Sequence, residues 1–407
     1  MNNRLDMTLG SDDHPLASTF DPTRATGLYR LDQFVARAGQ AYADGRNTDG
    51  GRDGPVAVSR LSPYLRYRVI SEREVVAAVL DRHSLVAADK FIQEVLWRTY
   101  WKGWLELRPS IWQRFVDERD RQRDSFPNTR ALVAAESGTT GIEGFDDWAR
   151  ELVETGYLHN HARMWFASIW IFTLRLPWAL GADFFLRHLL DADAASNTLS
   201  WRWVAGLQTT GKTYLATAEN IARYTNGRYA PVGLAREAVA LTEPAMEAAR
   251  SLPSLAKANT GEPSLLLITP EDMHPEVPRC VGAVIAADPD LLWGDGARNF
   301  VASLAKDAAA RSVADYGCPA QMIAKLDAAS LTHAARAAGV ARIVTAYAPV
   351  GPVADALASL GAQLAAEGVT LVQLRRRWDE QFWPNARKGF FPFKQQIPRL
   401  LREDGLQ

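Results

Sequence analysis

Two different hydrophobic patterns divide the chain. Between about residues 28 and 236, apolar side chains recur at three- and four-residue spacing, as in Leu31, Phe34 and Val35, which is typical of helices with one buried face. Period-two alternation does not occur in this half. The pattern therefore predicts a nearly all-helical region. Its clearest predicted helices cover 91–107, 145–155, 160–176 and 183–190.

The pattern changes after residue 263. Short, continuously apolar runs alternate there with longer amphipathic stretches, which predicts a parallel α/β sheet with helices on its faces. Neither a G-x-G-x-x-G nor a Walker-type loop occurs, so an ordinary dinucleotide or nucleoside triphosphate site is not expected. The apolar runs are 265–268, 281–285, 341–345 and 369–373, and the amphipathic stretches are 297–316, 328–338 and 353–367.

These patterns predict a multidomain α and α/β protein. We expect a flexible leader over 1–20, a helical domain over 21–236, a linker of helix and loop over 237–263, and an α/β domain over 264–407.

Composition narrows the class of protein. The 407 residues are 47% hydrophobic and 23% charged, which is usual for a soluble globular protein. The net charge of −1 means that any contact with nucleic acid needs a local basic groove. Only two cysteines occur, Cys280 and Cys318, so a reducing cytoplasm is expected. An apolar signal region is missing from 1–22, and Arg175 and Pro177 interrupt the most apolar stretch, so no membrane contact is expected.

Tryptophan is concentrated in one region, because ten of the thirteen lie between Trp97 and Trp203. On the predicted helix 91–107, Glu94, Trp97, Arg98 and Trp101 share one face. A face that mixes charges with large rings suits a pocket that stacks a planar ligand. The alternative is a tryptophan-rich core beside a surface ion pair between Glu94 and Arg98.

A second group of polar residues surrounds the next helix. Arg163 stands among apolar neighbours, so we expect it to point inward and to pair with an anion, Asp191 being the natural partner. His159 is more simply a core histidine with satisfied nitrogens. Asp191 and Asp193 could clamp a metal or sugar hydroxyls, but no His, Cys and Asp spacing matches a metal site, so no metal is predicted.

A third candidate lies upstream, where a loop enters a helix. Ser59 and Ser62 with free backbone amides could cradle a phosphate. The alternative is an ordinary helix N-cap.

In this order along the chain, these segments resemble those of the photolyase/cryptochrome family. The resemblance covers about 190 residues. It is carried by Tyr42-x₃-Arg46-Asn47, Val58-Ser-Arg-Leu-Ser-Pro-Tyr-Leu65, 91–101, 140–147, Tyr157-Leu-His-Asn-His-Ala-Arg-Met164 and 191–203. Phe391-Pro-Phe-Lys394 resembles the end of that family's α/β domain. The resemblance implies a helical flavin domain followed by an α/β antenna-like domain, which swaps the family's usual order.

The resemblance also implies FAD as the cofactor and assigns roles to residues. Residues implied to hold FAD are Tyr42, Ser59, Arg60, Leu61, Ser62, Arg98, Asn160, Arg163, Asp191, Asp193 and Asn197. Residues implied in repair chemistry are Glu94, Trp97, Asn160, Met164 and Trp203, with Asn197 facing the flavin N5. Trp201 and Trp178 match the first two members of an electron-relay chain, while the third is missing near 125–126. A second antenna chromophore is left unidentified.

The implied function is blue-light repair of cyclobutane pyrimidine dimers in DNA, with a flipped dimer stacked between Trp97 and Trp203. Two alternatives stay open. One is a cryptochrome-like photosensor that binds FAD and signals through a protein partner. The other is a remnant without flavin. Basic residues that could contact DNA phosphates are Arg202, Lys212, Arg223 and Arg228.

Overall fold

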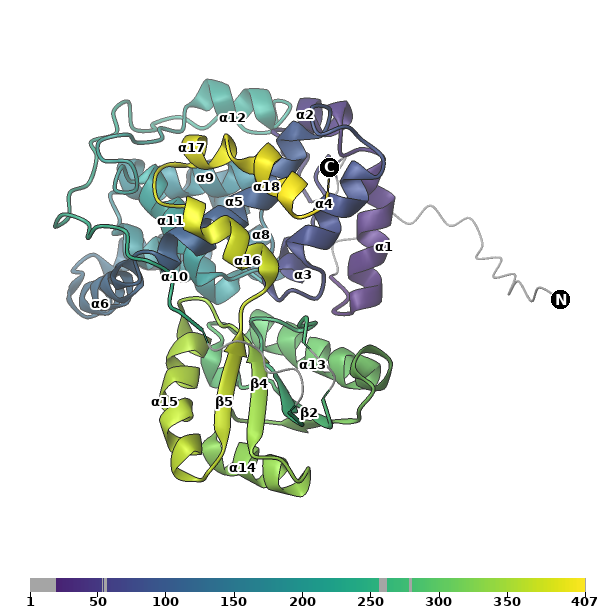
Figure 1. The fold of residues 1–407 in the computed structure, drawn as a ribbon. Coiled ribbons are helices and arrows are strands. Elements are labelled where there is room, and N and C mark those ends of the chain that lie inside the picture. Colours follow the sequence, from purple (N-terminus) through teal and green to yellow (C-terminus); the bar gives the residue numbers. More distant parts are fainter. Residues whose placement is uncertain (1–19, 53, 55–56, 256–261, 278–279, 407) are drawn as a thin grey trace.

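The structure is a computed structural model that describes residues 20–52, 54, 57–255, 262–277 and 280–406. The expected leader falls outside this range except for Phe20. Figure 1 shows a helical body above a smaller α/β part. None of the described helices is long and apolar enough to cross a bilayer.

The helical body follows the predicted three- and four-residue spacing, and its elements begin and end at recognisable signals. A capping box formed by Ser71 and Glu74 starts α4, and Gly156 ends α8 in a left-handed conformation. The elements are α1 (Arg24–Val35), α2 (Gln40–Gly45), α3 (Ser62–Arg66), α4 (Glu72–Leu80), α5 (Asp89–Glu106), α6 (Ser110–Ser125), α7 (Thr129–Ser137), α8 (Phe145–Thr155), α9 (Asn160–Ser168), the π-helical η1 (Ile169–Thr173), α10 (Trp178–His188), α11 (Ala194–Val204) and α12 (Ala218–Tyr224).

The α/β part confirms the predicted parallel sheet. Its five strands lie in the order β3-β2-β1-β4-β5, and every pairing is parallel. The elements are β1 (Leu265–Ile268), β2 (Gly282–Ala286), η2 (Pro289–Leu291), α13 (Asp295–Tyr316), β3 (Ala320–Ile323), α14 (Ala328–Ala337), β4 (Arg342–Ala346), α15 (Pro352–Ala366) and β5 (Thr370–Leu374).

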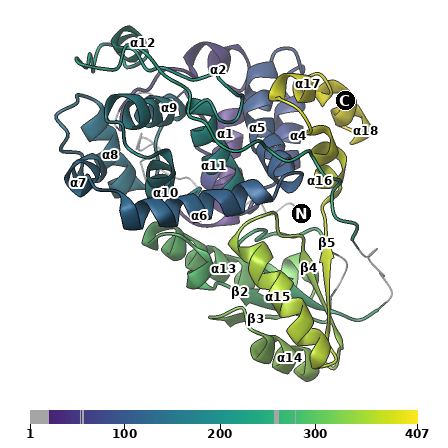
Figure 2. The same ribbon diagram turned by 90° about the vertical axis from the view of Figure 1, so that its left-hand side faces the viewer.

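Both faces of this sheet are covered, as expected from its continuously apolar strands. Leu266 and Ile268 belong to the large core that includes α13, whereas Leu265 and Leu267 pack with α14 and α15. The helical body meets the side of α13, where Phe300 contacts Tyr64 and Tyr67 with ring centroids 6.0 and 5.8 Å away. Figure 2 shows α13 between the sheet and the helical body.

The last helices return to the helical body, which differs from the expected α/β domain over 264–407. They are α16 (Arg377–Phe382), η3 (Trp383–Asn385), α17 (Phe390–Lys394) and α18 (Ile397–Glu403), and Figure 1 shows them in yellow across the upper part of the molecule. Trp378, Phe382 and Phe393 belong to the core of the helical body. A Cβ on Gly103 would lie 2.8 Å from the Cα of Trp383, so α5 and η3 are in close contact. The helical body is therefore built from two separate stretches of sequence.

The prediction of a helix within 237–263 is wrong for residues 237–255, which the structure describes as irregular chain. Two prolines, Pro244 and Pro253, interrupt the Ala/Leu/Glu pattern. The segment is held by separate contacts, such as the backbone N–H groups of Leu241 and Arg250 donating to the carbonyls of Ala205 and Leu107. Tertiary contacts thus replace the local hydrogen bonds of a helix.

Candidate functional site

The predicted face of α5 meets the start of α11 through a cluster of charges. Arg98 lies 3.3 Å from Asp193 and 3.5 Å from Asp191. Arg163 of α9 lies 3.3 Å from Asp191, so the predicted pairing of Arg163 with Asp191 is present. We call Arg98, Arg163, Asp191 and Asp193 the site cluster. It joins α5 and α9 to the start of α11.

The alternative ion pair between Glu94 and Arg98 is wrong. Glu94 pairs instead with Arg46, 3.2 Å away, at the end of α2. Burial raises the pKa of Glu94 above its usual value, although the Arg46 charge opposes this. One α5 face therefore points two polar side chains toward different neighbours, Glu94 toward α2 and Arg98 toward α11.

The two aspartates of the site cluster are buried and charged. Burial alone would raise the pKa of Asp191, but the Arg163 and Arg98 charges hold it below its usual value. Lys102, Arg98 and Arg66 lower the pKa of Asp193 in the same way, against the effect of burial. Asp193 also accepts a hydrogen bond from the backbone N–H of Ser196 at 2.7 Å and so caps α11. Both carboxylates remain acceptors at neutral pH.

The predicted amide residues lie in different environments. Asn197 is buried on α11 and donates a hydrogen bond to the carbonyl of Ala182 at 2.8 Å. Asn160 is exposed at the start of α9, and Met164 is half-buried one turn later. His159 is buried, its Nδ1 accepts from the His161 backbone N–H, and burial lowers its pKa to about 4. It is therefore a neutral core histidine, but the expectation that both nitrogens are satisfied is wrong, because Nε2 is buried without a hydrogen-bond partner in the described chain.

The loop before α3, where a phosphate cradle was predicted, lacks a side-chain cap. The first helical residue is Ser62, and the N-cap position, Leu61, makes no side-chain cap, so the alternative of an ordinary N-cap is wrong. Ser59 Oγ accepts only a long bond, 3.4 Å, from the Leu61 backbone N–H. Arg60 adopts a left-handed φ of 51°, which costs energy in a residue with a Cβ.

Several buried polar atoms around this loop and the site cluster have no hydrogen-bond partner within the described chain. They include Arg46 Nε, Arg60 Nε and Ser196 Oγ. Buried groups of this kind normally find a partner. Donors from α2, the loop and α11 are thus available to a polar ligand.

The predicted aromatic residues are arranged in two groups. Trp97 stacks on Phe390 of α17, with ring centroids 3.6 Å apart and an interplanar angle of 10°. Trp203 stacks on Tyr214 at 5.7 Å. Tyr42 lies in the core between Phe34 and Phe91, which meet its ring edge-on.

The two tryptophans of the predicted relay have different neighbours. Trp201 is buried among Phe166, Trp170 and Phe185, with ring centroids 6.4, 6.1 and 5.1 Å away. Trp178 contacts Phe115 at 5.7 Å. A Cβ on Gly181 would lie 2.3 Å from the Trp201 ring, so glycine is needed there for α10 and α11 to approach.

One predicted phosphate contact is wrong. Arg202 is buried, and its guanidinium donates to both carboxylate oxygens of Glu243. Arg228 is exposed and lies 3.1 Å from Asp49.

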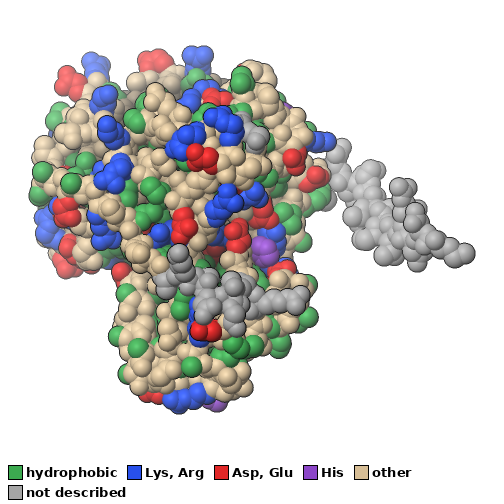
Figure 3. Space-filling model, in the orientation of Figure 1, with side chains coloured by type: hydrophobic (Ala, Val, Ile, Leu, Met, Phe, Trp, Pro, Cys, Tyr) green, Lys and Arg blue, Asp and Glu red, His purple; other side chains and the backbone are tan. Residues whose placement is uncertain are grey.

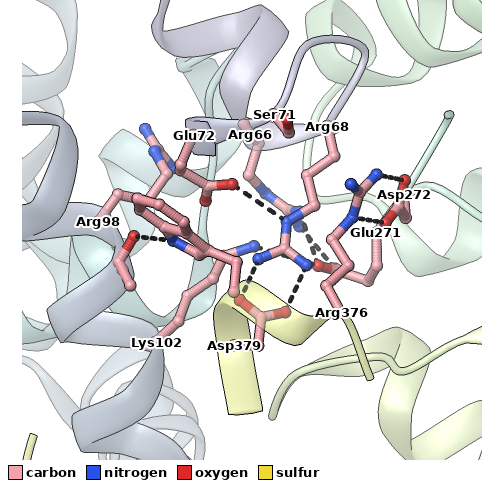
Figure 4. A network of polar contacts seen from close by, with 12 residues as sticks. Arg66, Arg68, Ser71, Glu72, Arg98, Lys102, Glu271, Asp272, Arg376 and Asp379 are labelled. Carbon is pink, nitrogen blue, oxygen red and sulfur yellow. Dashed lines mark hydrogen bonds and ion pairs between the residues drawn. The ribbon is translucent and has the colours of Figure 1, made fainter. Parts of the chain in front are cut away.

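A network of buried charges at the junction between the two parts was missed (Figure 4). Arg66 donates two hydrogen bonds of 2.8 Å to Glu271, and Arg68 donates two of 2.6 Å to Asp379. Arg376 donates to both oxygens of Asp272 at 2.6 and 2.9 Å. We call these three pairs the junction network. The sequence feature that could have predicted this network is the pair Glu271-Asp272, which follows an apolar strand. Polar groups at that position lie at the carboxyl edge of a parallel sheet.

The junction network fills the edge of the sheet where ligands commonly bind. The strand order reverses between β1 and β4, and ligands of open α/β sheets lie at the carboxyl ends of such strands. After β1, Glu271 and Asp272 are bonded to arginines, and after β4 the hydroxyl of Tyr347 donates to Glu106 at 2.8 Å. The polar groups at this crevice are therefore bonded to partners within the chain.

Comparison with known proteins identifies the helical body. Residues 91–228 match the family model described as the FAD binding domain of DNA photolyase. The deoxyribodipyrimidine photo-lyase of Streptomyces griseus is 36% identical over 169 residues, which are 41% of this chain and 35% of that enzyme. The enzyme of the same name from Thermus thermophilus is 33% identical over 187 residues, 46% of this chain and 43% of the enzyme.

Among solved structures, a bacterial class III photolyase from Agrobacterium tumefaciens is 29% identical, with a TM-score of 0.45, and the match covers 51% of this chain and 44% of that chain. The chain thus spans less than half the length of these relatives. Over residues 91–228, this protein contains an FAD-binding domain of the DNA photolyase type.

Proposed function

We propose that this protein repairs cyclobutane pyrimidine dimers in DNA with the help of blue light. The observation that carries the proposal is the site cluster, which lies within the matched segment and is surrounded by buried polar atoms that lack partners in the described chain. FAD has a charged pyrophosphate, a polyhydroxyl chain and a ring with polar edges, so it can bond these donors and carboxylates.

The residues around the site would divide the binding of FAD between them. Ser59 and Ser62 would donate to the pyrophosphate, assisted by the neighbouring charge of Arg60. Asp191 and Asp193 would accept from ribityl or adenine hydroxyls and the ring edge, held in place by Arg98 and Arg163. Asn197 is buried on α11 and would face the ring. When bound, reduced FAD supplies an electron upon light absorption.

The lesion side would lie beside Trp97. Flipped pyrimidines present flat apolar faces and polar edges, so they would stack on Trp97 and Trp203. Glu94, Asn160 and Met164 would complete the pocket. Because burial raises the pKa of Glu94, its carboxyl would hold a proton at Oε more readily than an exposed carboxyl and would donate it in a hydrogen bond to a pyrimidine carbonyl.

We further propose that the α/β part corresponds to the family's antenna domain in a swapped order. Its parallel five-stranded sheet supports this assignment.

The test is loss of thymine dimers from oligonucleotides under blue light, with purified and chemically reduced protein. The FAD content is first measured from the visible absorbance of the oxidised protein. Trp97→Ala should keep its FAD but lose about tenfold or more in dimer affinity, since stacking contributes about 1–3 kcal/mol per base. Trp97→Phe, which retains an aromatic face, should lose less.

Each other result has a definite meaning. A yellow protein that is photoreduced but leaves dimers intact would replace repair with the photosensor function. A colourless protein that does not bind added FAD would contradict both functions.

A further inference from the structure

Four arginines lie next to one another where α5 ends, and no carboxylate forms an ion pair with any of them in the described part of the chain. They come from four separate places in the sequence. They are Arg108 after α5, Arg250 in the irregular segment 237–255, Arg375 after β5 and Arg387 before α17. We call these four residues the basic strip.

Each arginine of the basic strip donates one side-chain hydrogen bond within the described chain, always to a backbone carbonyl. The bonds run from Arg108 to Arg387 (2.7 Å), from Arg387 to Ala249 (3.0 Å), from Arg250 to Glu106 (3.3 Å) and from Arg375 to Pro253 (2.9 Å). A neutral donor could satisfy these carbonyls equally well, so the bonds do not explain four charges. Because an arginine has five N–H donors, most donors of the basic strip are not used by the chain.

The clustering of these like charges is unfavourable for the folded protein by itself. Burial lowers the pKa of Arg108, and the charge of Arg387 lowers it further, although Tyr100 opposes this. Two buried groups of the basic strip, Arg108 Nη1 and Arg375 Nε, have no hydrogen-bond partner in the described chain. A surface of one sign with unused donors attracts ligands of the opposite sign. The basic strip therefore has the properties of a binding surface for a polyanion.

The carboxylate of Glu106 lies beside the basic strip but does not neutralise it. This side chain is fully buried, and it accepts hydrogen bonds from the Tyr347 hydroxyl at 2.8 Å and from the Val350 backbone N–H at 2.5 Å. Burial raises its pKa, although the charges of Arg375 and Arg250 oppose this. A buried carboxyl with its own hydrogen bonds leaves the outer side of the arginines to a ligand.

The basic strip is accessible, and two of its members are held in place by aromatic rings. Arg250 and Arg387 are exposed, and the other two are half-buried. The guanidinium of Arg108 lies over the Trp104 ring at 4.4 Å, and that of Arg375 lies over the Tyr347 ring at 4.6 Å. Figure 3 shows Lys and Arg side chains on the face where α16, α17 and α18 lie in Figure 1. An ordered row of exposed charges complements the regularly spaced phosphates of a DNA strand.

We propose that the basic strip binds phosphates of the DNA strand that flanks the pyrimidine dimer. This inference rests on the proposed function, which places the dimer at Trp97. The strip begins near that residue, because the Tyr100 hydroxyl, one turn further along α5, donates at 2.8 Å to the carbonyl of Lys388, the neighbour of Arg387. From Trp97 to Arg108 the chain rises by about 16 Å, a distance covered by about five nucleotides of one strand. Phosphate contacts carry no sequence information, so any flanking sequence would be held.

The basic strip predicts that binding depends on the length of the DNA around the dimer. We would measure, in the dark and by fluorescence anisotropy, the binding of reduced protein to two single-stranded oligonucleotides with one thymine dimer each. The short one ends about two nucleotides from the dimer and cannot reach Arg108, whereas the long one extends about twelve nucleotides on each side, at about 3.4 Å per nucleotide. Each titration is repeated over a range of salt concentrations. Repair of the short oligonucleotide under blue light is measured separately.

The double variant Arg250→Gln, Arg387→Gln should weaken binding of the long oligonucleotide by about two- to fivefold for each arginine at low salt. The slope of log affinity against log salt concentration should become shallower by about 1.4, because each phosphate contact to a single strand contributes about 0.7. Binding and repair of the short oligonucleotide should stay within about twofold of the wild type.

Two controls accompany this variant. Arg250→Lys with Arg387→Lys keeps both charges and should retain most of the affinity for the long oligonucleotide. Lys306→Gln removes an exposed charge from α13 and should change neither affinity. Thermal unfolding should be unchanged in all three proteins, because the substituted side chains are exposed.

Unchanged binding of the long oligonucleotide by the Gln variant would overturn the role of the basic strip, and repair of the short one would leave the proposed function standing. Equal losses for both oligonucleotides would overturn it as well, because the arginines would then act on the lesion pocket or on folding. A polyglutamate peptide whose binding is lost in the Gln variant, with DNA binding unchanged, would assign the strip to an acidic protein partner. Wild-type protein that binds neither oligonucleotide would remove the proposed function together with this inference.

Discussion

The junction network and the site cluster are adjacent groups of buried charges, and the lengths of their contacts differ. In the junction network, each arginine meets its carboxylate through two hydrogen bonds of 2.6 to 2.9 Å. In the site cluster, Arg98 and Arg163 reach their aspartates at 3.3 to 3.5 Å. Paired hydrogen bonds satisfy a carboxylate, whereas the longer contacts leave it able to accept further bonds. The comparison separates charges that hold distant segments of the chain together from charges that are available to a ligand.

The environment of Arg68 supports the structural role of the first group. Burial alone would lower its pKa, but Asp379 and Glu72 raise it well above the usual value, so this arginine stays charged. Burying charges costs free energy. In the junction network this cost is offset only in the one arrangement that brings each arginine to its carboxylate. The junction therefore specifies how the C-terminal helices and the sheet sit on the helical body.

The largest expected effect is at the junction. Arg68→Ala removes one partner of a fully buried pair and leaves Asp379 unpaired, which should lower the free energy of unfolding by about 3–5 kcal/mol. Urea denaturation followed by circular dichroism measures this change. FAD affinity, measured where the variant is folded, should be unaffected. A variant as stable as the wild type would contradict the structural role of the junction network.

The next effect is expected at Asp193, which belongs to the site cluster through Arg98 and also contacts Arg66 of the junction network, and Lys102. Asp193→Asn keeps the cap of α11 but removes the charge, which should cost about 1.5–3 kcal/mol at pH 7. The depressed pKa of Asp193 sets the pH dependence. The stabilisation by its charge is complete above the ordinary aspartate value of about 3.9 and is lost as the pH falls through the lower folded value.

Unfolding of the wild type and Asp193→Asn should therefore differ at pH 6 and converge in stronger acid. A difference that stays constant with pH would show that the charge of Asp193 does not contribute.

A smaller effect, on binding alone, is expected at Asp191. Asp191→Asn keeps the shape of the side chain and removes an acceptor charge, so FAD affinity should fall about tenfold to a hundredfold. The free energy of unfolding without FAD should change much less than in Arg68→Ala. Titration of the apoprotein with FAD measures the first effect. Loss of stability equal to that of Arg68→Ala would remove the distinction between the two groups.

The smallest effect is expected for an exposed pair in the same C-terminal segment. Arg399 and Glu403 lie 2.6 Å apart, but their side chains are 47% and 49% exposed. Arg399→Ala should change the free energy of unfolding by about 0–1 kcal/mol. This variant is the control for Arg68→Ala, and a large loss here would show that short contacts alone do not identify structural pairs.

Local sequence was sufficient for the features that depend on neighbours along the chain. The spacing of Leu31, Phe34 and Val35 predicts a helix that the structure contains as α1. The apolar run 265–268 predicts a strand and matches β1. The apolar neighbours of Arg163 were enough to predict an internal anion, and Asp191 is close by in sequence as well as in space.

Sequence was insufficient where the partner comes from a distant segment. Glu94 pairs with Arg46 and not with Arg98, because α2 lies beside the start of α5. The 237–255 segment has helical composition but forms irregular chain, since contacts with α5 and α11 satisfy its backbone. Phe390 could not be connected to Trp97, since the two lie in distant parts of the chain.

The sequence by itself thus determined most of the element types outside 237–255, the division into a helical and an α/β part, and the set of polar residues around Asp191, because periodicity and side-chain chemistry are local properties. The tertiary structure alone decided that α16, α17 and α18 complete the helical body, that the edge of the sheet is closed by Arg66 and Arg376, and that Phe390 stacks on Trp97. These features depend on which surfaces meet when apolar area is buried and charges must find partners, and that choice is made by the whole chain together.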